Sequence, residues 1–350
     1  MRAVVYRGRE NVVVEDVGEP SCGSDQVKVK VAYNGICGTD LHEYYAGPIF
    51  VPAGEPHPLT GQAMPLVLGH EFAGTVVEAG ADVTGIETGA NVTIEPVYRC
   101  DTCASCREGR YNTCQQVAFH GLMADGGMAE YTVVQPRMVH RLPDPVSLEL
   151  GALVEPMSVA YHAARLSGVG AGDSAIVFGA GPIGIGIWFA LRGLGLEEIT
   201  VVEPSEARRK AIAGVGADPV IDPTTTDPAK HIRQRTGGRG ADAAFDAAGV
   251  PASVGAALDS LGAHRKLIAV AIYERPMAVE LLKLVMSETA VQGSLCYTGE
   301  DYSAVIDLMA SGHYDTKGWL THVPLDQVVD EGFAALHEGR KMKVLLDVVP

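Results

Sequence analysis

The chain has 350 residues, 47% of them hydrophobic, which is enough to form more than one domain with its own core. It carries 27 basic and 43 acidic side chains, and the formal charge of −16 repels nucleic-acid phosphates and anionic lipid surfaces. The composition therefore argues against a nucleic-acid partner or a membrane partner.

The two ends of the sequence and its cysteine content indicate the cellular compartment. The first eleven residues contain no apolar stretch of signal-peptide length, and nothing near the C-terminus resembles an anchor or an address. Seven cysteines is an odd number, and four of them crowd between Cys100 and Cys114. This usage favours metal ligands over disulfides, so we expect a cytoplasmic protein.

Up to about residue 145 the sequence predicts a mainly β region. Short strand-like runs are separated by Gly, Pro and Asp; they cover Val12 to Val14, Val27 to Val31, Thr75 to Glu78 and Tyr131 to Val134.

Within this region, two short segments carry possible metal ligands. Cys37-Gly38-Thr39-Asp40-Leu41-His42 is followed by Gly69-His70-Glu71, and Glu155 follows the β region. Cysteine, histidine and glutamate are competent zinc ligands, and three protein ligands leave one position for a substrate. Taken singly, a cysteine is more often a small buried hydrophobe and a histidine more often a surface residue.

The four clustered cysteines predict a second, different metal site. Cys100, Cys103, Cys106 and Cys114 follow the spacing C-x2-C-x2-C-x7-C, which brings four thiolates within reach of one ion. Four thiolates leave no open coordination position, so a zinc ion there would be structural. An iron-sulfur centre and free thiols are the alternatives.

After Glu155, apolar strand-like runs alternate with helix-like stretches, which predicts a parallel sheet covered by helices. The runs are 174–178, 183–194, 198–202, 206–215, 243–246, 253–261 and 266–271. We expect this domain to end near Gln292. The remaining tail is predicted to return to loops and to end on a strand from Val344 to Val349.

The first strand and helix of this domain flank a dinucleotide-binding turn. The turn is a full G-x-G-x-x-G, made of Gly179, Ala180, Gly181, Pro182, Ile183 and Gly184. Its glycines permit a tight turn, close approach of the backbone to a pyrophosphate, and close packing of helix and strand. A glycine-rich packing turn is the alternative.

The next strand ends in Glu203, 19 residues beyond Gly184, where an acidic side chain would bind the hydroxyls of the adenosine ribose. A carboxylate there repels a 2′-phosphate, which favours NAD over NADP. Arg208 and Arg209 follow closely and could stack on adenine or accommodate that phosphate.

Together, GHEFAGTVVEAG (residues 69–80), the four-cysteine loop and GAGPIG resemble the zinc-dependent medium-chain dehydrogenase/reductase family over essentially the whole chain. The resemblance implies an α/β fold with two domains. One is a β-rich, GroES-like catalytic domain, formed by residues 1–155 and the returning segment 293–350. The other is a doubly wound parallel-sheet (Rossmann) NAD domain over residues 156–292.

The resemblance also implies roles for the candidate residues. Cys37 and His70 would bind the catalytic zinc, Thr39 would touch the substrate oxygen, and His42 would relay its proton. Either Glu71 or Glu155 would complete the ligand set, because Glu155 stands where familiar alcohol dehydrogenases have cysteine. The implied chemistry is hydride transfer from an alcohol to NAD, with two zinc ions in each chain.

Substrate choice depends on the 26 residues between His42 and Gly69, which include a long insertion from Ala46 to Pro65. The GPIF and PHPLTG elements of this insertion resemble the insertion in the butanediol dehydrogenase branch, although a surface loop is the simpler interpretation. We therefore expect interconversion of 2,3-butanediol and acetoin, and of acetoin and diacetyl. His57 is a weaker candidate for the pocket. A sorbitol-type polyol or other secondary-alcohol dehydrogenase is the main alternative.

The remaining expectations concern assembly and secondary contacts. Family resemblance implies a homodimer or homotetramer in which cofactor domains pair through their sheet edges. Val270 and Ser294 follow strand-like runs and are expected to contact the cofactor, with loop packing as the alternative. Some relatives have lost their zinc ligands and are not catalytic, but Cys37, His70 and both glutamates are present here.

Overall fold

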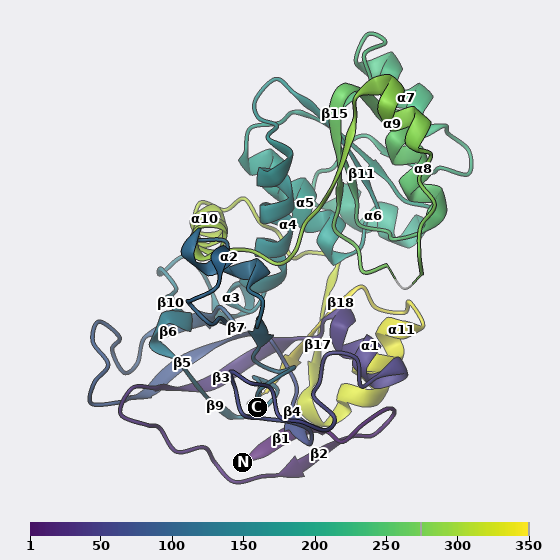
Figure 1. Cartoon of the computed structure of the whole chain (residues 1–350). Helices are drawn as coiled ribbons and strands as arrows, with labels where there is room; N and C mark the ends of the chain where they lie inside the picture. Colours follow the sequence, from purple (N-terminus) through teal and green to yellow (C-terminus); the bar gives the residue numbers. More distant parts are fainter. Residues whose placement is uncertain (274, 349–350) are drawn as a thin grey trace. The chain divides into compact units, whose positions relative to one another are not determined.

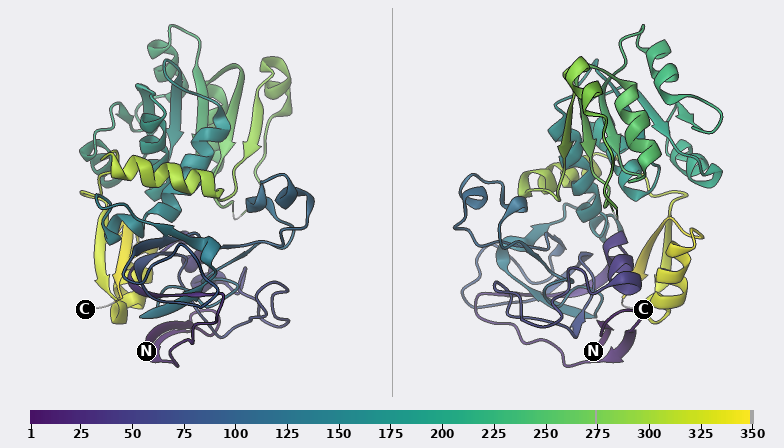
Figure 2. Two further views of the ribbon diagram at one scale, coloured as in Figure 1. Left: turned by 90° about the vertical axis from the view of Figure 1, so that its left-hand side faces the viewer. Right: turned by 45° about the vertical axis from the view of Figure 1, so that its right-hand side comes forward.

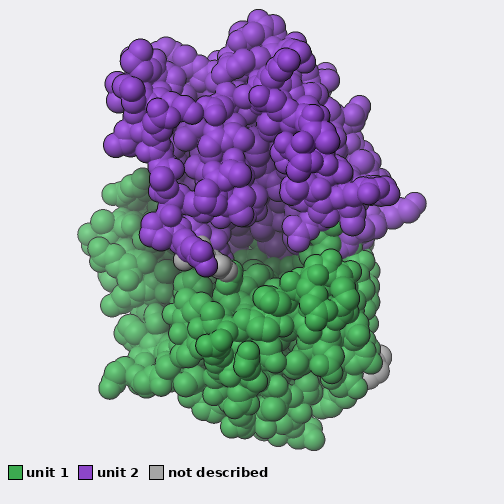
Figure 3. All heavy atoms as spheres, turned by 90° about the vertical axis from the view of Figure 1, so that its right-hand side faces the viewer, with its two compact units in different colours: residues 1–155, 298–311, 320–350 green, residues 156–297, 312–319 purple. Residues whose placement is uncertain are grey.

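The computed structural model describes residues 1–273 and 275–348. The chain divides into two compact units (Figure 3). Unit 1 contains residues 1–155, 298–311 and 320–350, and unit 2 contains residues 156–297 and 312–319. The C-terminal part therefore contributes to both units, with an eight-residue segment counted in unit 2.

Unit 2 is built on a six-stranded sheet in the order β13-β12-β11-β14-β15-β16, with every neighbouring pair parallel. This order corresponds to 3-2-1-4-5-6, the doubly wound arrangement of dinucleotide-binding domains. The strands are β11 (Ser174–Phe178), β12 (Glu198–Val202), β13 (Val220–Ile221), β14 (Ala241–Asp246), β15 (Leu261–Ala269) and β16 (Ala290–Gly293).

Helices lie along both faces of this sheet (Figures 1 and 2). They are α4 (Val154–Ser167, beginning in unit 1), α5 (Pro182–Gly193), α6 (Glu206–Gly214), α7 (Pro228–Arg235), α8 (Pro251–Ser260) and α9 (Leu281–Ser287). The central strand β11 is buried along its whole length, as expected for a strand covered on both faces. The predicted fold class is confirmed for this unit.

Unit 1 is mainly β structure, as predicted, and most of its strand pairs are antiparallel. Its large sheet has the order β10-β6-β5-β3-β18-β17, with β9 also paired to β3, and a smaller sheet has the order β2-β1-β4. The strands are β1 (Arg2–Tyr6), β2 (Val12–Asp16), β3 (Val27–Gly35), β4 (Leu66–Val67), β5 (Glu71–Ala79), β6 (Asn91–Ile94), β7 (Val97–Tyr98), β8 (Ala118–Phe119), β9 (Tyr131–Val134), β10 (Val139–Arg141), β17 (Leu320–Pro324) and β18 (Lys343–Asp347).

The helices of unit 1 are short except for two. They are α1 (Gly38–Ala46), α2 (Ala104–Arg107), α3 (Leu148–Gly151), α10 (Gly299–Ala310) and α11 (Ala335–His337), with 3-10 turns at 111–113, 136–138 and 325–327 and a π-helical stretch at 328–334. One apolar core joins the strands of both sheets with residues of the C-terminal segment, including Phe333 and Leu346.

The expectation that the tail is made of loops is wrong for α10. This helix buries Tyr302, Val305, Ile306 and Met309 at helical spacing, and Thr298 and Asp301 form a capping box at its start. Both signals were present in the sequence. The final predicted strand is present as β18, but Val349 lies outside the described residues.

One further finding concerns membranes. Among the described residues, no helix has the length and apolar character needed to cross a bilayer. The uncharged run at residues 174–191 is divided between β11 and α5, so it does not form one continuous apolar helix.

Candidate active site and metal centres

Strand β3 delivers Cys37 to the start of helix α1. Cys37 occupies the N-cap position, and its backbone N–H donates a hydrogen bond to Oδ2 of Asp40 at 2.9 Å. Its Sγ lies 3.6 Å from Oγ1 of Thr39. His42 lies three residues beyond Thr39, so the two side chains are neighbours on the surface of the same helix.

Strand β5 brings His70 and Glu71 to the same place. In the antiparallel pairing of β3 with β5, Glu71 stands opposite Gly35, two residues before Cys37. A Cβ at Gly35 would lie 2.0 Å from Oε2 of Glu71, so only glycine permits this approach. As a result, one ligand atom each of Cys37, His70 and Glu71 lies within 4.8 Å of the others.

Asp40 lies behind His70. Its carboxylate is fully buried, and its Oδ1 lies 3.7 Å from Nδ1 of His70. Neither atom has a hydrogen-bond partner among the described residues. Burial raises the pKa of Asp40 to about 6, although the neighbouring His70 charge acts in the opposite direction. A slightly closer approach would let Nδ1–H donate to Asp40 and leave Nε2 for a metal, the arrangement typical of zinc-binding histidines.

Sequence reasoning missed Lys343, which lies beside this cluster. Strand β18 pairs with β3 and carries Lys343, whose side chain is 2% exposed. Its Nζ forms an ion pair with Oε2 of Glu71 and donates to the carbonyl oxygen of Ile36 at 3.0 Å. Glu71 therefore already has a cationic partner, which competes with direct ligation of a metal.

Glu155, the other candidate carboxylate, lies in the first turn of α4 and is 6% exposed. The ligand cluster found among the described residues does not contain it. Its negative charge nevertheless acts to raise the pKa of both His70 and Lys343, so Glu155 belongs to the same electrostatic environment.

The four-cysteine loop forms a compact cluster by itself. The Sγ atoms of Cys100 and Cys106 are 3.9 Å apart, those of Cys100 and Cys114 are 3.5 Å apart, and Cys103 completes the set. Tetrahedral zinc–thiolate geometry places sulfurs about 3.8 Å apart. Backbone N–H groups donate to Cys100 and Cys114, which stabilises thiolates. The donor set and spacing fit a zinc ion.

A partly buried hydrogen-bond network that the sequence did not predict supports this loop. Oη of Tyr111 donates to Oε1 of Glu95 at 2.5 Å, and Nε2 of His140 lies 2.9 Å from the other oxygen of Glu95. Tyr111 also accepts a hydrogen bond from the backbone N–H of Gly299 at the start of α10. The cysteine loop is thereby joined to the missed helix.

The glycine turn of unit 2 has the shape needed for a dinucleotide. Gly179 has φ +100°, and a Cβ at Gly184 would lie 1.9 Å from the carbonyl oxygen of Gly179. A Cβ at Gly181 would meet no atom within 4 Å, so the space in front of this residue is open. Helix α5 begins directly after it, with Pro182 and Ile183 in its first turn. Its N–H groups are therefore available to a phosphate.

Glu203, predicted to bind the hydroxyls of the adenosine ribose, makes hydrogen bonds within the protein that the sequence did not predict. It is 3% exposed, and its carboxylate accepts hydrogen bonds from the backbone N–H groups of Ala180 at 2.8 Å and Ser205 at 2.9 Å. It therefore holds the glycine turn in place. Arg209 donates to the carbonyl oxygens of Glu203 and Pro204, whereas Arg208 is exposed.

The other predicted contacts lie at the same edge of the parallel sheet. Val270 follows β15 and Ser294 follows β16; the Oγ of Ser294 is buried without a hydrogen-bond partner among the described residues. Asp246, at the end of β14, accepts from Oγ of Ser253 and Oη of Tyr273. Ligands of doubly wound sheets bind at this edge.

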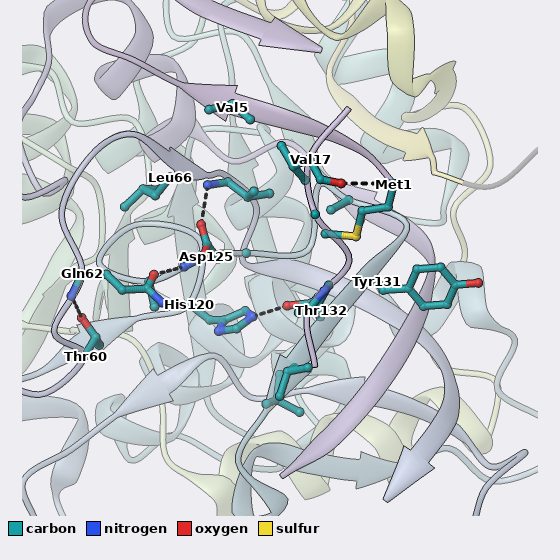
Figure 4. Close-up of a pocket in the computed structure, with 18 of the residues that line it drawn as sticks. Met1, Val5, Val17, Thr60, Gln62, Leu66, His120, Asp125, Tyr131 and Thr132 are labelled. Carbon is teal, nitrogen blue, oxygen red and sulfur yellow. Dashed lines mark hydrogen bonds between the residues drawn. The ribbon is translucent and has the colours of Figure 1, made fainter. Parts of the chain in front are cut away.

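A cavity of about 550 Å³ in unit 1 is separate from these sites (Figure 4). Its lining includes none of the predicted ligands. His120 contributes to its wall, with Nε2 2.7 Å from Oγ1 of Thr132, and burial lowers the pKa of His120 to about 3. This histidine is therefore neutral and hydrogen-bonded, as expected of a structural residue.

Comparison with known proteins identifies the class that this fold and these clusters define. Residues 23–144 match the alcohol dehydrogenase GroES-like domain, and residues 182–311 match the zinc-binding dehydrogenase domain. The chain belongs to the zinc-dependent alcohol dehydrogenase family. It is an oxidoreductase with a small alcohol or ketone as its substrate, which confirms the predicted family and the enzymatic role.

Within this family the chain is similar to a (R,R)-butanediol dehydrogenase of Bacillus subtilis, with 38% identity over 99% of both chains. The crystal structure of 2R,3R-butanediol dehydrogenase from Bacillus subtilis superimposes with a TM-score of 0.92 over 99% of both chains, again at 38% identity.

Two other solved structures contain nicotinamide cofactors. A zinc-binding dehydrogenase from Sinorhizobium meliloti is bound to NADP, with 29% identity, a TM-score of 0.88 and coverage of 99% of this chain and 98% of that one. A short chain alcohol dehydrogenase from E. coli CFT073 is complexed with NADH, with 25% identity, a TM-score of 0.88 and coverage of 99% of both chains.

Proposed function

We propose that this enzyme interconverts 2,3-butanediol and acetoin, and acetoin and diacetyl, by hydride transfer with NAD. The observation that carries the proposal is the cluster of Cys37, His70 and Glu71 in a chain that is similar to (R,R)-butanediol dehydrogenase over nearly its whole length.

In this proposal Cys37, His70 and one carboxylate hold a catalytic zinc ion, and Asp40 orients His70. Zinc bound there supplies Lewis acidity that favours loss of the substrate hydroxyl proton. Thr39 would accept that proton while releasing its own toward His42, which would pass a proton to solvent, and bound NAD would accept the hydride from the alcohol carbon. The ion pair between Lys343 and Glu71 supports Glu155 as the carboxylate that takes part when the metal is bound.

A second zinc ion is assigned to Cys100, Cys103, Cys106 and Cys114, where the sulfur spacing supports a closed tetrahedral shell. Such a shell has no place for a substrate, so its role is to hold the loop. We propose a reducing, cytoplasmic location, because the clustered cysteines are assigned to a metal ion and not to disulfides.

We assign cofactor binding to unit 2 and metal binding to unit 1, and we propose NAD rather than NADP. The buried carboxylate of Glu203 beside the glycine turn would repel a 2′-phosphate. Arg209 is occupied by backbone carbonyls and by an ion pair with Asp222 at 3.1 Å. Of the two predicted arginines, this leaves Arg208 to stack on adenine.

We further propose that two copies of the chain pair through unit 2. The edge strand β16 follows helix α9, where Leu281, Leu282, Val285 and Met286 are between 65% and 79% exposed. An exposed edge strand beside a large apolar patch is typical of an interface. Val285→Lys should shift the enzyme to a smaller species in sedimentation velocity, and an unchanged sedimentation coefficient would contradict this interface.

The test of function is NADH formation by the purified enzyme across the three stereoisomers of 2,3-butanediol, sorbitol and simple secondary alcohols. We expect a preference for a butanediol isomer, and elemental analysis should find two zinc ions per chain. A strong preference for sorbitol would overturn the substrate assignment, and one zinc ion would indicate the structural site alone.

A further inference from the structure

Glu43, in the last turn of α1, binds the first residues of the insertion. We call residues 47–51 the anchored turn. The carboxylate of Glu43 is fully buried and accepts backbone N–H groups from Ile49 at 3.0 Å, Phe50 at 2.5 Å and Val51 at 3.3 Å. A buried carboxylate is costly unless such donors satisfy it. These hydrogen bonds therefore fix the backbone of the anchored turn to α1.

Two other residues close this arrangement. The backbone N–H of Gly47 donates to the carbonyl oxygen of Glu43 at 3.0 Å, and a Cβ at Gly47 would lie 2.4 Å from that oxygen and 2.6 Å from Oε2 of Glu43. Oη of Tyr6 donates to the same carbonyl oxygen at 3.0 Å. Burial and the adjacent Glu43 raise the pKa of Tyr6 to about 12, so the hydroxyl remains a donor.

The far end of the insertion is also held. Oγ1 of Thr60 donates to the carbonyl oxygen of Met123 at 2.5 Å. Oε1 of Gln62 accepts the backbone N–H of Asp125 at 2.7 Å, as Figure 4 shows. His57, the weaker pocket candidate, lies between the two attachments and accepts the backbone N–H of Leu59. The insertion is therefore an ordered element with two attachments to the rest of unit 1.

The anchored turn holds two large apolar side chains in solvent. Ile49 is 52% exposed and Phe50 is 41% exposed, although their backbone groups are fixed. The helix that anchors them begins at Cys37, which belongs to the metal cluster. An exposed apolar pair whose backbone is tied to this helix is suited to contact a substrate held at the cluster.

We propose that Glu43 is a positioning residue and that Ile49 and Phe50 determine substrate specificity. Their side chains form an apolar rim that favours alcohols with short alkyl substituents over polyhydroxylated chains. A methyl group gains free energy by leaving water against this rim, whereas a hydroxyl there loses its hydrogen bonds to water. The inference rests on the proposed function, because it explains why a butanediol would be preferred to a hexitol.

The experiment separates the side chains from their anchor. In the first arm, the double variant Ile49→Ser, Phe50→Ser should lower the ratio of kcat/KM for 2,3-butanediol to that for sorbitol by about tenfold, with normal zinc content. Both side chains are exposed, so these substitutions leave the core intact.

In the second arm, Glu43→Gln replaces one acceptor oxygen with an NH2 group, and Gly47→Ala inserts a Cβ into the closed turn. Both should raise the KM for butanediol by about tenfold and change kcat by less than about twofold, because the apolar rim becomes mobile. Hydrogen exchange of the peptide covering residues 47–51 should accelerate in both. Glu15→Gln, at an exposed ion pair with Arg7, is the matched control and should change neither readout.

Unchanged exchange of residues 47–51 in both anchor variants would overturn the role of Glu43. An unchanged specificity ratio in the side-chain variant would overturn the role of Ile49 and Phe50. If the wild-type enzyme oxidises other alcohols but not butanediol, the proposed function fails. In that case the roles of Glu43, Ile49 and Phe50 are still tested with the same variants. The readouts are hydrogen exchange of residues 47–51 and the ratio of kcat/KM for the best apolar substrate to kcat/KM for the best polyhydroxylated substrate.

Discussion

The two cysteine-containing clusters of unit 1 are assembled in opposite ways. The four-cysteine site comes from one 15-residue stretch whose own backbone N–H groups face the sulfurs. The other cluster draws Cys37 from the N-cap of α1 just after β3, His70 and Glu71 from the residues that begin β5, and Lys343 from β18 near the C-terminus. A local site holds its own loop, whereas the second site depends on the register of three strands. The two should therefore respond differently to mutation.

The largest effect is expected at the assembled site. Cys37→Ser should reduce turnover by roughly a thousandfold or more, because the ligand that helps hold the Lewis acid is lost. Binding of NADH, followed by fluorescence titration, should remain within about twofold, because the glycine turn lies in unit 2. Equal loss of turnover and NADH binding would contradict the separation of the two sites.

Lys343→Met tests the buried ion pair with Glu71. Removing one partner of a buried pair leaves an uncompensated charge, and we expect a loss of about 3–5 kcal/mol in the free energy of unfolding of zinc-depleted protein. Zinc should restore part of this loss, because Glu71 then faces a cation. Urea unfolding with and without zinc measures both quantities. Lys210→Met, at an exposed pair with Glu206, should change the free energy of unfolding far less. A loss of equal size with and without zinc would disprove the competition between Lys343 and the metal.

Cys103→Ser tests the local site. Loss of the structural ion should destabilise unit 1 by about 3 kcal/mol, which corresponds to a decrease in Tm of roughly 6–12 °C. The turnover of the protein that remains folded should change by less than about threefold. Differential scanning calorimetry and active-site-normalised kinetics provide the two readouts. A loss of turnover as large as that of Cys37→Ser would remove the distinction between the clusters.

The smallest effect is expected at His322, which attaches β18 to α3. Its ring lies 2.7 Å from Oδ1 of Asp347 and 3.2 Å from Oε2 of Glu149. Burial lowers the pKa of His322, but the two carboxylates outweigh burial and raise it. The aromatic ring of Tyr33 packs edge-on against the ring of His322.

Because the folded-state pKa of His322 is raised, its contribution to stability is complete below the unfolded value of about 6.5 and disappears as pH rises through the folded value. The difference in Tm between the wild type and His322→Gln should therefore be largest near pH 5.5 and smallest near pH 9. We expect the charged ring of His322 to contribute less than about 1 kcal/mol to the free energy of unfolding, since the side chains are partly exposed. A difference that grows with pH would show that the carboxylates do not stabilise the charged ring.

Much of the fold could be predicted because its signals are local. The alternation of strands and helices after Glu155, and the short strands before it, follow from the periodicity of apolar residues. Helix α10 replaces the loops predicted for the C-terminal tail, although its apolar spacing and capping box are local signals of a helix. Its packing through Tyr302, whose hydroxyl donates to the carbonyl oxygen of Ile94 at 2.7 Å, joins residues 208 positions apart.

The sequence by itself determined the chemical groups and their local spacing. These are the four clustered thiols, the glycine turn, and the presence of Cys37, His70 and two candidate glutamates. Only the tertiary structure decided which of these groups meet. It placed Glu71 in the cluster and against Lys343, and it assigned the carboxylate of Glu203 to the glycine turn. It also used Glu43 to anchor the insertion. The physical reason is that spacing along the chain determines contacts within a turn or a helix, whereas contacts between distant strands depend on sheet register and on how each buried charge finds its partner.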